Sequence, residues 1–291
     1  PVGLIGGFGW SGDSKSIGMT FITFNSSADV YEYNTASKEF IRWTESELGG
    51  MDVSTLQEPK LISWKSFDAR TISGYLYKAS SRFTGKRPVI INIHGGPESQ
   101  SRPAFNPLTE FYVRELGIAV LLPNVRGSEG YGKTYVQLDN GMKREDSVKD
   151  IGALLDWLPT RADLDASRVM VTGGSYGGYM TLASATHFSD RVRCFVDVVG
   201  VSNFVTFLEK TEVYRLDMRR AEYGDERDPK MREFLERIAP VNSVERMTRP
   251  MFVVAGRNDP RVPASESDQI VAALKPGGIP VWYLVAKQEG H

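Results

Sequence analysis

The stretch RVMVTGGSYGGYMTLASATH, residues 168–187, decides the fold class of this chain. An apolar run typical of a strand buried on both faces ends at Gly173, and a segment compatible with a helix follows almost at once. Ser175 stands between them, with glycines two residues before and two residues after it. This is the Gly-x-Ser-x-Gly nucleophile elbow, in which a serine is held in strained geometry on a tight strand-to-helix turn. The strand and helix around the motif favour the elbow over a plain glycine-rich turn.

The same alternation of strands and helices extends over residues 60–291. Two alternating runs at its start, 60–67 and 70–78, predict an antiparallel hairpin. The later apolar runs predict parallel strands, with amphipathic helices between them over 107–116, 145–158 and 264–275. We therefore expect an α/β fold with a mostly parallel eight-stranded sheet and helices on both faces. The remaining expected strands are 88–94, 117–123, 168–173, 193–199, 250–256 and 281–286.

Residues 1–58 differ in texture from the rest of the chain. Short alternating runs separated by turn clusters predict a small antiparallel meander. It is too small to bury a core of its own, so we expect it to belong to a larger β structure or to pack on its neighbour. Residues 7–12, GFGWSG, match the dinucleotide-binding fingerprint GxGxxG, but that motif needs a helix after it. A turn and a strand are expected here instead, which disfavours nucleotide binding.

The composition excludes several classes of protein. The chain has 291 residues, 41% of them hydrophobic and 24% charged, and a formal net charge of −1, which is ordinary for a globular protein. No basic stripe suggests a nucleic-acid partner, and the longest apolar runs are too short to cross a bilayer. Three scattered histidines and one cysteine give no metal-ligand spacing, and we expect no cofactor.

The single cysteine, Cys194, excludes an internal disulfide and lies in an apolar run, so we expect a buried small hydrophobe. Its presence as a lone thiol slightly favours a reducing, cytoplasmic compartment. The oligomeric state is not fixed by these features, and a homo-oligomer is compatible with them.

A serine hydroxyl is a weak nucleophile and needs a base. In this architecture the base follows the serine along the chain, after an acid. His94 precedes Ser175, and His187 lies twelve residues beyond it, at the far end of the helix that follows the elbow. His291, the last residue, follows the last predicted strand, where a base at the carboxyl edge of the sheet is expected.

The acid that orients the base is expected after the preceding strand. The run 250–256 leads directly into a loop that contains Asp259, whereas Asp268 lies on a predicted helix and is the weaker alternative. The predicted triad is therefore Ser175, Asp259 and His291.

Two backbone N–H groups are candidates for holding an oxyanion. One belongs to Tyr176, the first residue after the serine. The other belongs to Gly96 in the sequence HGGP, which follows the strand 88–94; a plain strand-ending turn is the alternative for this loop.

A helix normally follows the catalytic histidine in this fold and covers one face of the sheet. We expect a chain that ends at His291 to lack this C-terminal helix and to leave an apolar face bare. A base at a frayed terminus would be poorly held, so such a fragment is expected to be less active or inactive.

Five motifs in this order resemble the prolyl oligopeptidase family of serine peptidases: HGGPESQ, NVRGSEGYGKTY, GGSYGGYM, GRNDPRVP and QEGH. The resemblance covers about residues 60 to 291. It implies an α/β-hydrolase domain, here 59–291, that carries a Ser-Asp-His triad. It also implies a preceding β-propeller that restricts access to short peptides, and residues 1–58 resemble the last part of such a propeller.

The resemblance also implies roles for single residues. Arg261 would hold a carbonyl of the substrate, and three residues would line the pocket for the side chain before the scissile bond: Val199, Val201 and Val262. Family members with a tyrosine as oxyanion donor carry it where this chain has His94, so the chain looks closer to the acylaminoacyl-peptidase branch. Arg126 is expected to anchor its loop through an ion pair.

Taken together, the residues and the resemblance predict a serine peptidase that hydrolyses short peptides through an acyl-enzyme. A carboxylesterase on the same fold is a close alternative, because the same triad cleaves esters. A non-catalytic binding module is the alternative from a different class, and an intact triad argues against it.

Overall fold

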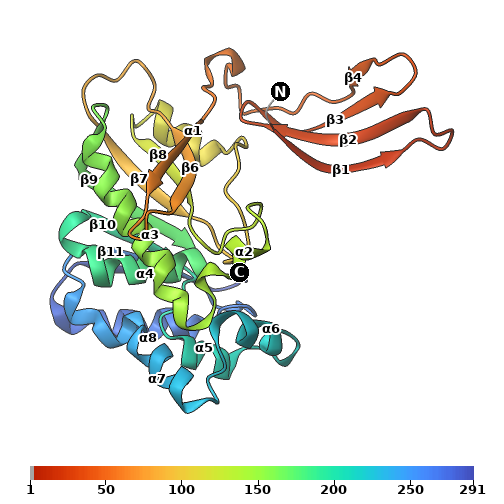
Figure 1. Cartoon of the computed structure of the whole chain (residues 1–291). Coiled ribbons are helices and arrows are strands. Elements are labelled where there is room, and N and C mark those ends of the chain that lie inside the picture. Colours follow the sequence, from red (N-terminus) through yellow and green to blue (C-terminus); the bar gives the residue numbers. More distant parts are fainter. Residues whose placement is uncertain (1–2) are drawn as a thin grey trace. The chain divides into compact units, whose positions relative to one another are not determined.

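The computed structural model describes residues 3–291, and the chain divides into two compact units (Figure 1). The first unit consists of Pro1–Leu61, Tyr75–Phe83 and Arg102–Val120. The second consists of Ile62–Gly74, Thr84–Ser101 and Leu121–His291, and it contains every residue of the predicted triad.

The N-terminal strands form a four-stranded antiparallel sheet in chain order, as predicted for the meander. Asp29 lies buried within it, and its carboxylate accepts hydrogen bonds from the Arg42 side chain (2.6 Å) and the Ser46 backbone (2.7 Å). The glycines of GFGWSG begin within the first strand and a second strand follows, so the helix that a nucleotide fingerprint requires is absent from this described segment. The four strands are β1 (Leu4–Trp10), β2 (Ser16–Thr23), β3 (Ser26–Asn34) and β4 (Phe40–Arg42).

The remaining eight strands form one sheet in the order β12-β11-β10-β9-β7-β8-β6-β5. All eight lie within a few residues of the predicted positions, and β7 and β9 to β12 pair in parallel. Their bounds are β5 (Lys60–Lys65), β6 (Thr71–Tyr77), β7 (Arg87–Ile93), β8 (Ala119–Asn124), β9 (Leu164–Gly174), β10 (Cys194–Val198), β11 (Met251–Gly256) and β12 (Val281–Ala286).

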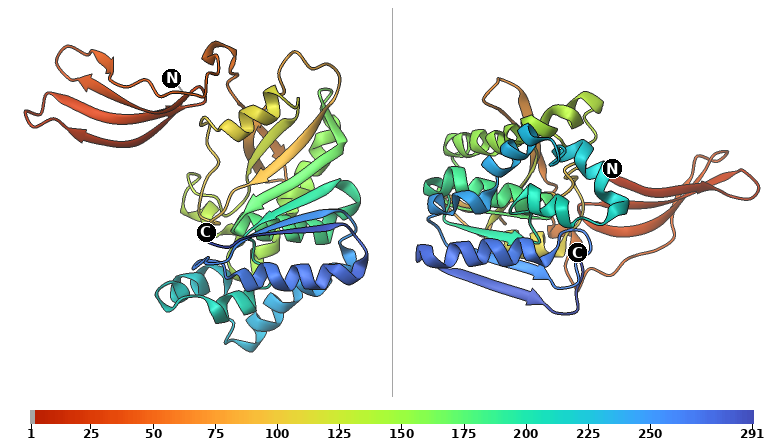
Figure 2. Two further views of the ribbon diagram at one scale, coloured as in Figure 1. Left: turned by 180° about the vertical axis from the view of Figure 1, so that it is seen from behind. Right: turned by 90° about the horizontal axis from the view of Figure 1, so that it is seen from below.

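Three predicted helices are present as α1 (Pro107–Arg114), α3 (Arg144–Trp157) and α8 (Ala264–Leu274), and α4 (Tyr176–Phe188) follows the elbow. Helix α4 packs on β9 and β10, α3 packs on α4, and α8 packs on β11 and β12 (Figure 2). The apolar face predicted for residues 145–158 is buried. Shorter helical segments are α2 (Lys133–Val136), η1 (Val53–Thr55), η2 (Gln137–Asp139), η3 (Gly141–Lys143), η4 (Leu158–Thr160), η5 (Ser189–Arg191), η6 (Pro240–Arg246) and η7 (Lys275–Gly277).

Between β10 and β11 the chain inserts three helices that the sequence analysis did not describe: α5 (Phe204–Lys210), α6 (Val213–Tyr223) and α7 (Pro229–Arg237). α5 has only seven residues, and α6 and α7 carry many charged residues, so the segment offers no long amphipathic pattern. The helices pack on one another, α5 against both α6 and α7.

One face of the strands β10 to β12 is incompletely covered. Trp282 and Leu284 on β12 are exposed. Cys194 at the start of β10 is half-buried rather than buried as predicted, because β10 alternates and only Phe195 and Asp197 of this strand face the covered side.

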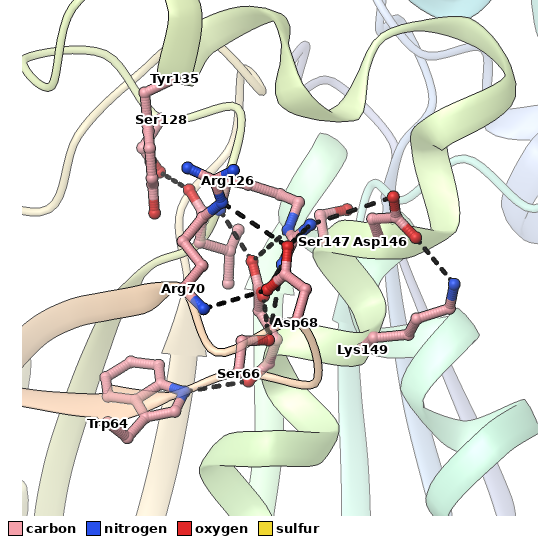
Figure 3. A network of polar contacts seen from close by, with 12 residues as sticks. Trp64, Ser66, Asp68, Arg70, Arg126, Ser128, Tyr135, Asp146, Ser147 and Lys149 are labelled. Atoms are coloured by element: carbon pink, nitrogen blue, oxygen red, sulfur yellow. Dashed lines mark hydrogen bonds and ion pairs between the residues drawn. The ribbon is translucent and has the colours of Figure 1, made fainter.

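Arg126, which follows β8, joins three segments that are far apart in the sequence (Figure 3). Its guanidinium donates to both carboxylate oxygens of Asp150 on α3 (2.8 and 3.0 Å) and to Asp68 in the turn between β5 and β6 (3.1 and 3.2 Å). Ser66 donates to the same Asp150 carboxylate. The expected ion-pair role of Arg126 is confirmed.

We predict that Arg126→Ala lowers the free energy of unfolding by about 3–5 kcal/mol, because it leaves the buried Asp150 carboxylate without its charged partner. Arg168→Ala is the matched control, since Arg168 forms an exposed pair with Asp165 and should cost less than about 1 kcal/mol. Urea denaturation followed by circular dichroism measures both. Equal losses in the two variants would contradict a special role for the Arg126 cluster.

Candidate active site

Ser175 occupies the sharp turn between β9 and α4. Its φ of 59° and ψ of −120° lie in a region that residues other than glycine rarely adopt, so the backbone is strained as an elbow requires. The Ser175 N–H donates to the carbonyl of Val198 on β10 (2.9 Å). The half-buried Ser175 hydroxyl makes no hydrogen bond with residues 3–291. The backbone is thus fixed while the oxygen stays available.

The glycines of the elbow are required by contact. A Cβ on Gly177 would collide with the carbonyl oxygen of Ile93 on β7, and one on Gly173 would collide with the carbonyl oxygen of Gly177. Helix α4 can therefore approach β7 and β9 only because both positions lack side chains.

Asp259 and His291 form a hydrogen-bonded pair of 2.7 Å between Oδ2 and Nδ1. The other oxygen of Asp259 accepts from the backbone N–H groups of Arg261 (2.8 Å) and Val262 (2.9 Å). Burial alone would raise the pKa of Asp259, but the hydrogen bonds from His291 and these N–H groups outweigh it and hold the pKa below its usual value. An ionised carboxylate only accepts, so Nδ1 carries the proton and Nε2 of His291 is left as a possible base.

Asp268, the alternative acid, has other partners. It accepts a hydrogen bond from the Tyr283 hydroxyl (2.8 Å) and lies 3.6 Å from the Arg257 guanidinium. The structure therefore pairs His291 with Asp259.

The parallel register places the three predicted residues at one edge of the sheet. Gly174 pairs with Val198, Val198 with Val254, and Val254 with Leu284, and the chain continues past these positions to Ser175, Asp259 and His291. The segment before His291 is tied to the β11 loop, because the Asn258 N–H donates to the carbonyl of Glu289 (3.0 Å).

The loop after β7 borders the serine. A Cβ built on Gly95 would lie 3.4 Å from the Cβ of Ser175. Gly96 has a φ of 129°, which strongly favours glycine. The ring nitrogens of His94 are both engaged, Nδ1 with the carbonyl of Gly95 (2.7 Å) and Nε2 with the Ser128 hydroxyl (2.8 Å). Burial lowers the pKa of His94, so its ring is held in the loop as a largely neutral imidazole.

Tyr176 begins α4, so its backbone N–H has no acceptor inside the helix. Its side chain points into a buried polar cluster that the sequence analysis missed. The Tyr176 hydroxyl contacts Asp139 (3.0 Å), Ser147 (2.9 Å) and the guanidinium of Arg144 (3.1 Å). No sequence signal distinguished Arg144, because it lies in an ordinary charged helix start.

The residues implied by family resemblance lie near the same edge of the sheet. The exposed Arg261 guanidinium has no hydrogen bond or ion pair with the residues that the structure describes. Val199 is half-buried with a φ of 47°, unusual for a β-branched residue. Val201 and Val262 are buried. His187 pairs with Glu145 (2.9 Å) at the far end of α4, in agreement with its expected place away from the serine.

Asp197 is a buried acid behind the elbow. It lies on β10 between Gly178 of α4 and Gly200, and a Cβ on either glycine would collide with its carboxylate. Its carboxylate has no side-chain hydrogen-bond partner among residues 3–291, and the backbone N–H of Gly200 is the one group that favours its ionised form. Burial raises the pKa of Asp197 to about 7. An acidic residue inside the apolar run RCFVDVVG was the sequence signal for it.

Residues 3–291 contain no cluster of three or more His, Cys, Asp or Glu side chains suited to a metal ion. Within the same range, every helix is too short or too polar to span a membrane.

Residues 103–291 match the model of the prolyl oligopeptidase family. Among curated proteins, the chain is 33% identical to dipeptidyl peptidase family member 6 of Caenorhabditis elegans, over 96% of this chain and 41% of the relative. It is 31% identical to the acylamino-acid-releasing enzyme of Arabidopsis thaliana, over 75% of this chain and 29% of the relative. The chain thus spans well under half the length of these relatives.

Among solved structures, the acylaminoacyl peptidase of Pyrococcus horikoshii superposes with a TM-score of 0.87 at 23% identity. The match covers 100% of this chain and 46% of that one. At this identity the likeness establishes the fold, which is the α/β-hydrolase fold.

We predict that the contribution of Asp197 to the free energy of unfolding falls as pH rises from about 4 to about 7. The folded protein retains a proton on Asp197 that the unfolded chain releases above the usual aspartate pKa of 3.8. The resulting destabilisation is therefore absent below that pH and complete above about 7. The full difference corresponds to about 4 kcal/mol. Asp197→Asn cannot ionise and should flatten this part of the profile.

Urea denaturation of both proteins between pH 4 and 8 measures the difference. Parallel stability profiles for the wild type and Asp197→Asn would contradict a raised pKa of Asp197.

Proposed function

Because the chain belongs to the prolyl oligopeptidase family, near its acylaminoacyl-peptidase branch, we propose that it forms the catalytic part of a serine peptidase acting on short peptides. The observation that carries the proposal is the 2.7 Å hydrogen bond between Asp259 and His291, formed at the sheet edge where the strained Ser175 is presented. No other described histidine is bonded to an acid at this edge.

In the proposed mechanism the Ser175 oxygen attacks the carbonyl carbon of the scissile peptide bond. Nε2 of His291 takes the serine proton and then gives it to the leaving amine as the C–N bond breaks. Water deprotonated by the same nitrogen then attacks the acyl carbon, the ester C–O bond to Ser175 breaks, and the proton returns to the Ser175 oxygen as the acid product leaves. Asp259 holds the imidazole tautomer and stabilises the imidazolium formed in each step.

The negative charge on the tetrahedral carbonyl oxygen needs donors that are in place beforehand. We assign this role to the backbone N–H groups of Tyr176 and Gly96. The free N–H at the start of α4 and the approach of Gly95 to Ser175 support the assignment. The engagement of both His94 ring nitrogens within the loop supports backbone donors over a side-chain donor at that position.

Substrate binding is assigned to Arg261 and three valines. The unpaired, exposed guanidinium of Arg261 suits a main-chain carbonyl of a peptide, which accepts its N–H donors. The apolar pocket for the residue before the scissile bond is assigned to Val199, Val201 and Val262. The named activities of the relatives, dipeptidyl peptidase and acylamino-acid release, favour cleavage near a peptide terminus.

We also assign residues 1–58 to the end of a β-propeller and residues 59–291 to the catalytic domain. The four-stranded antiparallel sheet β1–β4 supports this assignment, since propeller blades are sheets of four strands. A propeller would admit only short peptides to the active site.

A carboxylesterase is the second candidate, because the same triad hydrolyses esters. Arg261 favours the peptidase, since an ester substrate lacks the flanking peptide carbonyls that this side chain would hold. A non-catalytic binding module would not need the Asp259–His291 pair or the strained Ser175 backbone.

We predict that Ser175→Ala and Asp259→Asn each lower kcat for a peptide p-nitroanilide by about 10⁴-fold or more, because the first removes the nucleophile and the second disturbs the histidine tautomer. Ser184→Ala is the matched control: Ser184 lies on the same helix, buried, with an unpartnered hydroxyl, and the variant should keep wild-type kcat. A fluorophosphonate probe with mass spectrometry should locate the label on Ser175. If the full-length protein is inactive and unlabelled, the binding module is supported instead.

We predict that Arg261→Ala raises KM for the peptide anilide by about 10-fold or more, because a charged hydrogen bond to the substrate is lost. KM for a nitrophenyl ester should change less than about threefold, because the ester lacks the carbonyl that Arg261 would hold. Arg257→Ala, which removes an exposed arginine near Asp268, is the control and should leave KM for both substrates unchanged. Steady-state kinetics with both substrates separate the candidates. Equal losses on peptide and ester would argue against a peptide-binding role for Arg261.

A further inference from the structure

The last turn of α6 contacts the loop that carries Gly96. The Tyr223 hydroxyl donates to the Gly96 carbonyl oxygen (3.2 Å), and Nη1 of Arg219 donates to the same oxygen (3.2 Å). Arg219 also contacts the Tyr223 hydroxyl (3.3 Å), and its guanidinium lies over the Tyr223 ring. One carbonyl of the loop is therefore held by two side chains from α6.

The same turn also contacts the start of α4. Nη2 of Arg144 donates to the backbone carbonyl of Glu222 (2.8 Å) and to its carboxylate, while Nη1 donates to Asp139 and contacts the Tyr176 hydroxyl. The rings of Tyr176 and Tyr223 stack at 6.3 Å with an interplanar angle of 19°, and the Arg144 guanidinium lies close to both rings. The turn of α6 is thus linked to Tyr176 by charge and by ring packing.

These links are buried and therefore rigid. Arg144, Tyr176 and Tyr223 are each at most 2% exposed, and Glu222 and Arg219 are also buried. Water cannot readily replace these hydrogen bonds, and removing one partner leaves another charged or polar group unsatisfied. The outer side of α6 differs, because Val213, Tyr214 and Met218 are exposed. The helix is held by its last turn.

We propose that the last turn of α6 sets the distance between the two oxyanion donors, with Tyr223 as the positioning residue. This rests on the proposed function, in which the donors are the N–H groups of Tyr176 and Gly96. An oxyanion is stabilised only when both donors lie about 2.7–3.1 Å from one point, so their separation must be fixed before the reaction. Tyr223 contacts the residues of both donors: its hydroxyl bonds to the Gly96 carbonyl, and its ring stacks on the ring of Tyr176.

Tyr223→Phe tests the proposal, because it removes the hydroxyl and keeps the ring. We expect kcat for the peptide anilide to fall by about 10-fold, less than the 10²–10³-fold typical of losing a donor itself, with KM within about twofold. The Ki of a peptidyl trifluoromethyl ketone should rise in parallel, because the oxygen of its serine adduct occupies the oxyanion site. Binding of a cleaved product peptide should not change.

Tyr179→Phe is the matched control. Tyr179 belongs to the same aromatic cluster, is fully buried and packs on Tyr176, but its hydroxyl has no partner among the described residues. It should keep wild-type kcat and Ki. Arg219→Met tests the same Gly96 contact from the second donor and should lower kcat several-fold, which covers the case in which Tyr223→Phe does not fold.

The outcomes separate the two proposals. If a folded Tyr223→Phe or Arg219→Met keeps wild-type kcat and Ki, the positioning role is overturned while the peptidase stands. Equal kcat losses in Tyr223→Phe and Tyr179→Phe overturn it as well, because general loosening of the aromatic cluster then explains both. If the wild type neither cleaves the anilide nor labels Ser175, the proposed function fails, and the positioning role fails with it.

Discussion

The contact between Gly177 and the carbonyl of Ile93 is the constraint on which the site depends. It brings the first turn of α4 against β7, and Gly178 brings the same turn against Asp197 and Gly200 beside β10. The contacts with Ile93 and Gly200 are backbone contacts, which cannot relax by a change of rotamer. The strained dihedral angles of Ser175 follow from them, since the chain must turn from β9 into α4 within one residue. The position of the serine is therefore determined by the packing of the sheet and not by the flexible loops around it.

Buried charged side chains hold the loops at this edge of the sheet. Arg126 ties the loop after β8 to α3, and Arg144 links η2, α6 and the elbow helix. Glu266 at the start of α8 accepts from the backbone N–H groups of Ser202 and Asn203, which precede α5. In each case a charge removed from water is satisfied by groups from distant parts of the sequence, so a shift of one loop would break several hydrogen bonds at once. The loops of the candidate site are consequently positioned by polar contacts that form only in the folded domain.

Much of this arrangement could be predicted from the sequence, because the signals for it lie in short stretches of neighbouring residues. Apolar runs and glycine spacing are properties of neighbouring residues, so the eight strands, the elbow and the place of Asp259 after β11 were within reach of pattern reasoning. The helices α5 to α7 were missed because α5 has only seven residues and α6 and α7 carry many charged residues. The cluster around Arg144 could not be predicted, since the contact with Glu222 spans 78 residues and nothing in either segment marks it. Asp197 was visible as an acid in an apolar strand, but its lack of a side-chain partner follows only from the packing of Gly178 and Gly200.

The elbow also bears on how the protein is made. Its geometry requires β7, β9 and β10 to be assembled, because the residues that crowd Gly177 and Gly178 come from segments on both sides of the serine in the chain. Until the downstream strand has emerged from the ribosome and docked, Ser175 is an ordinary hydroxyl on a flexible peptide. The strained geometry of Ser175, and with it the reactivity proposed for this serine, therefore arises only as the domain closes.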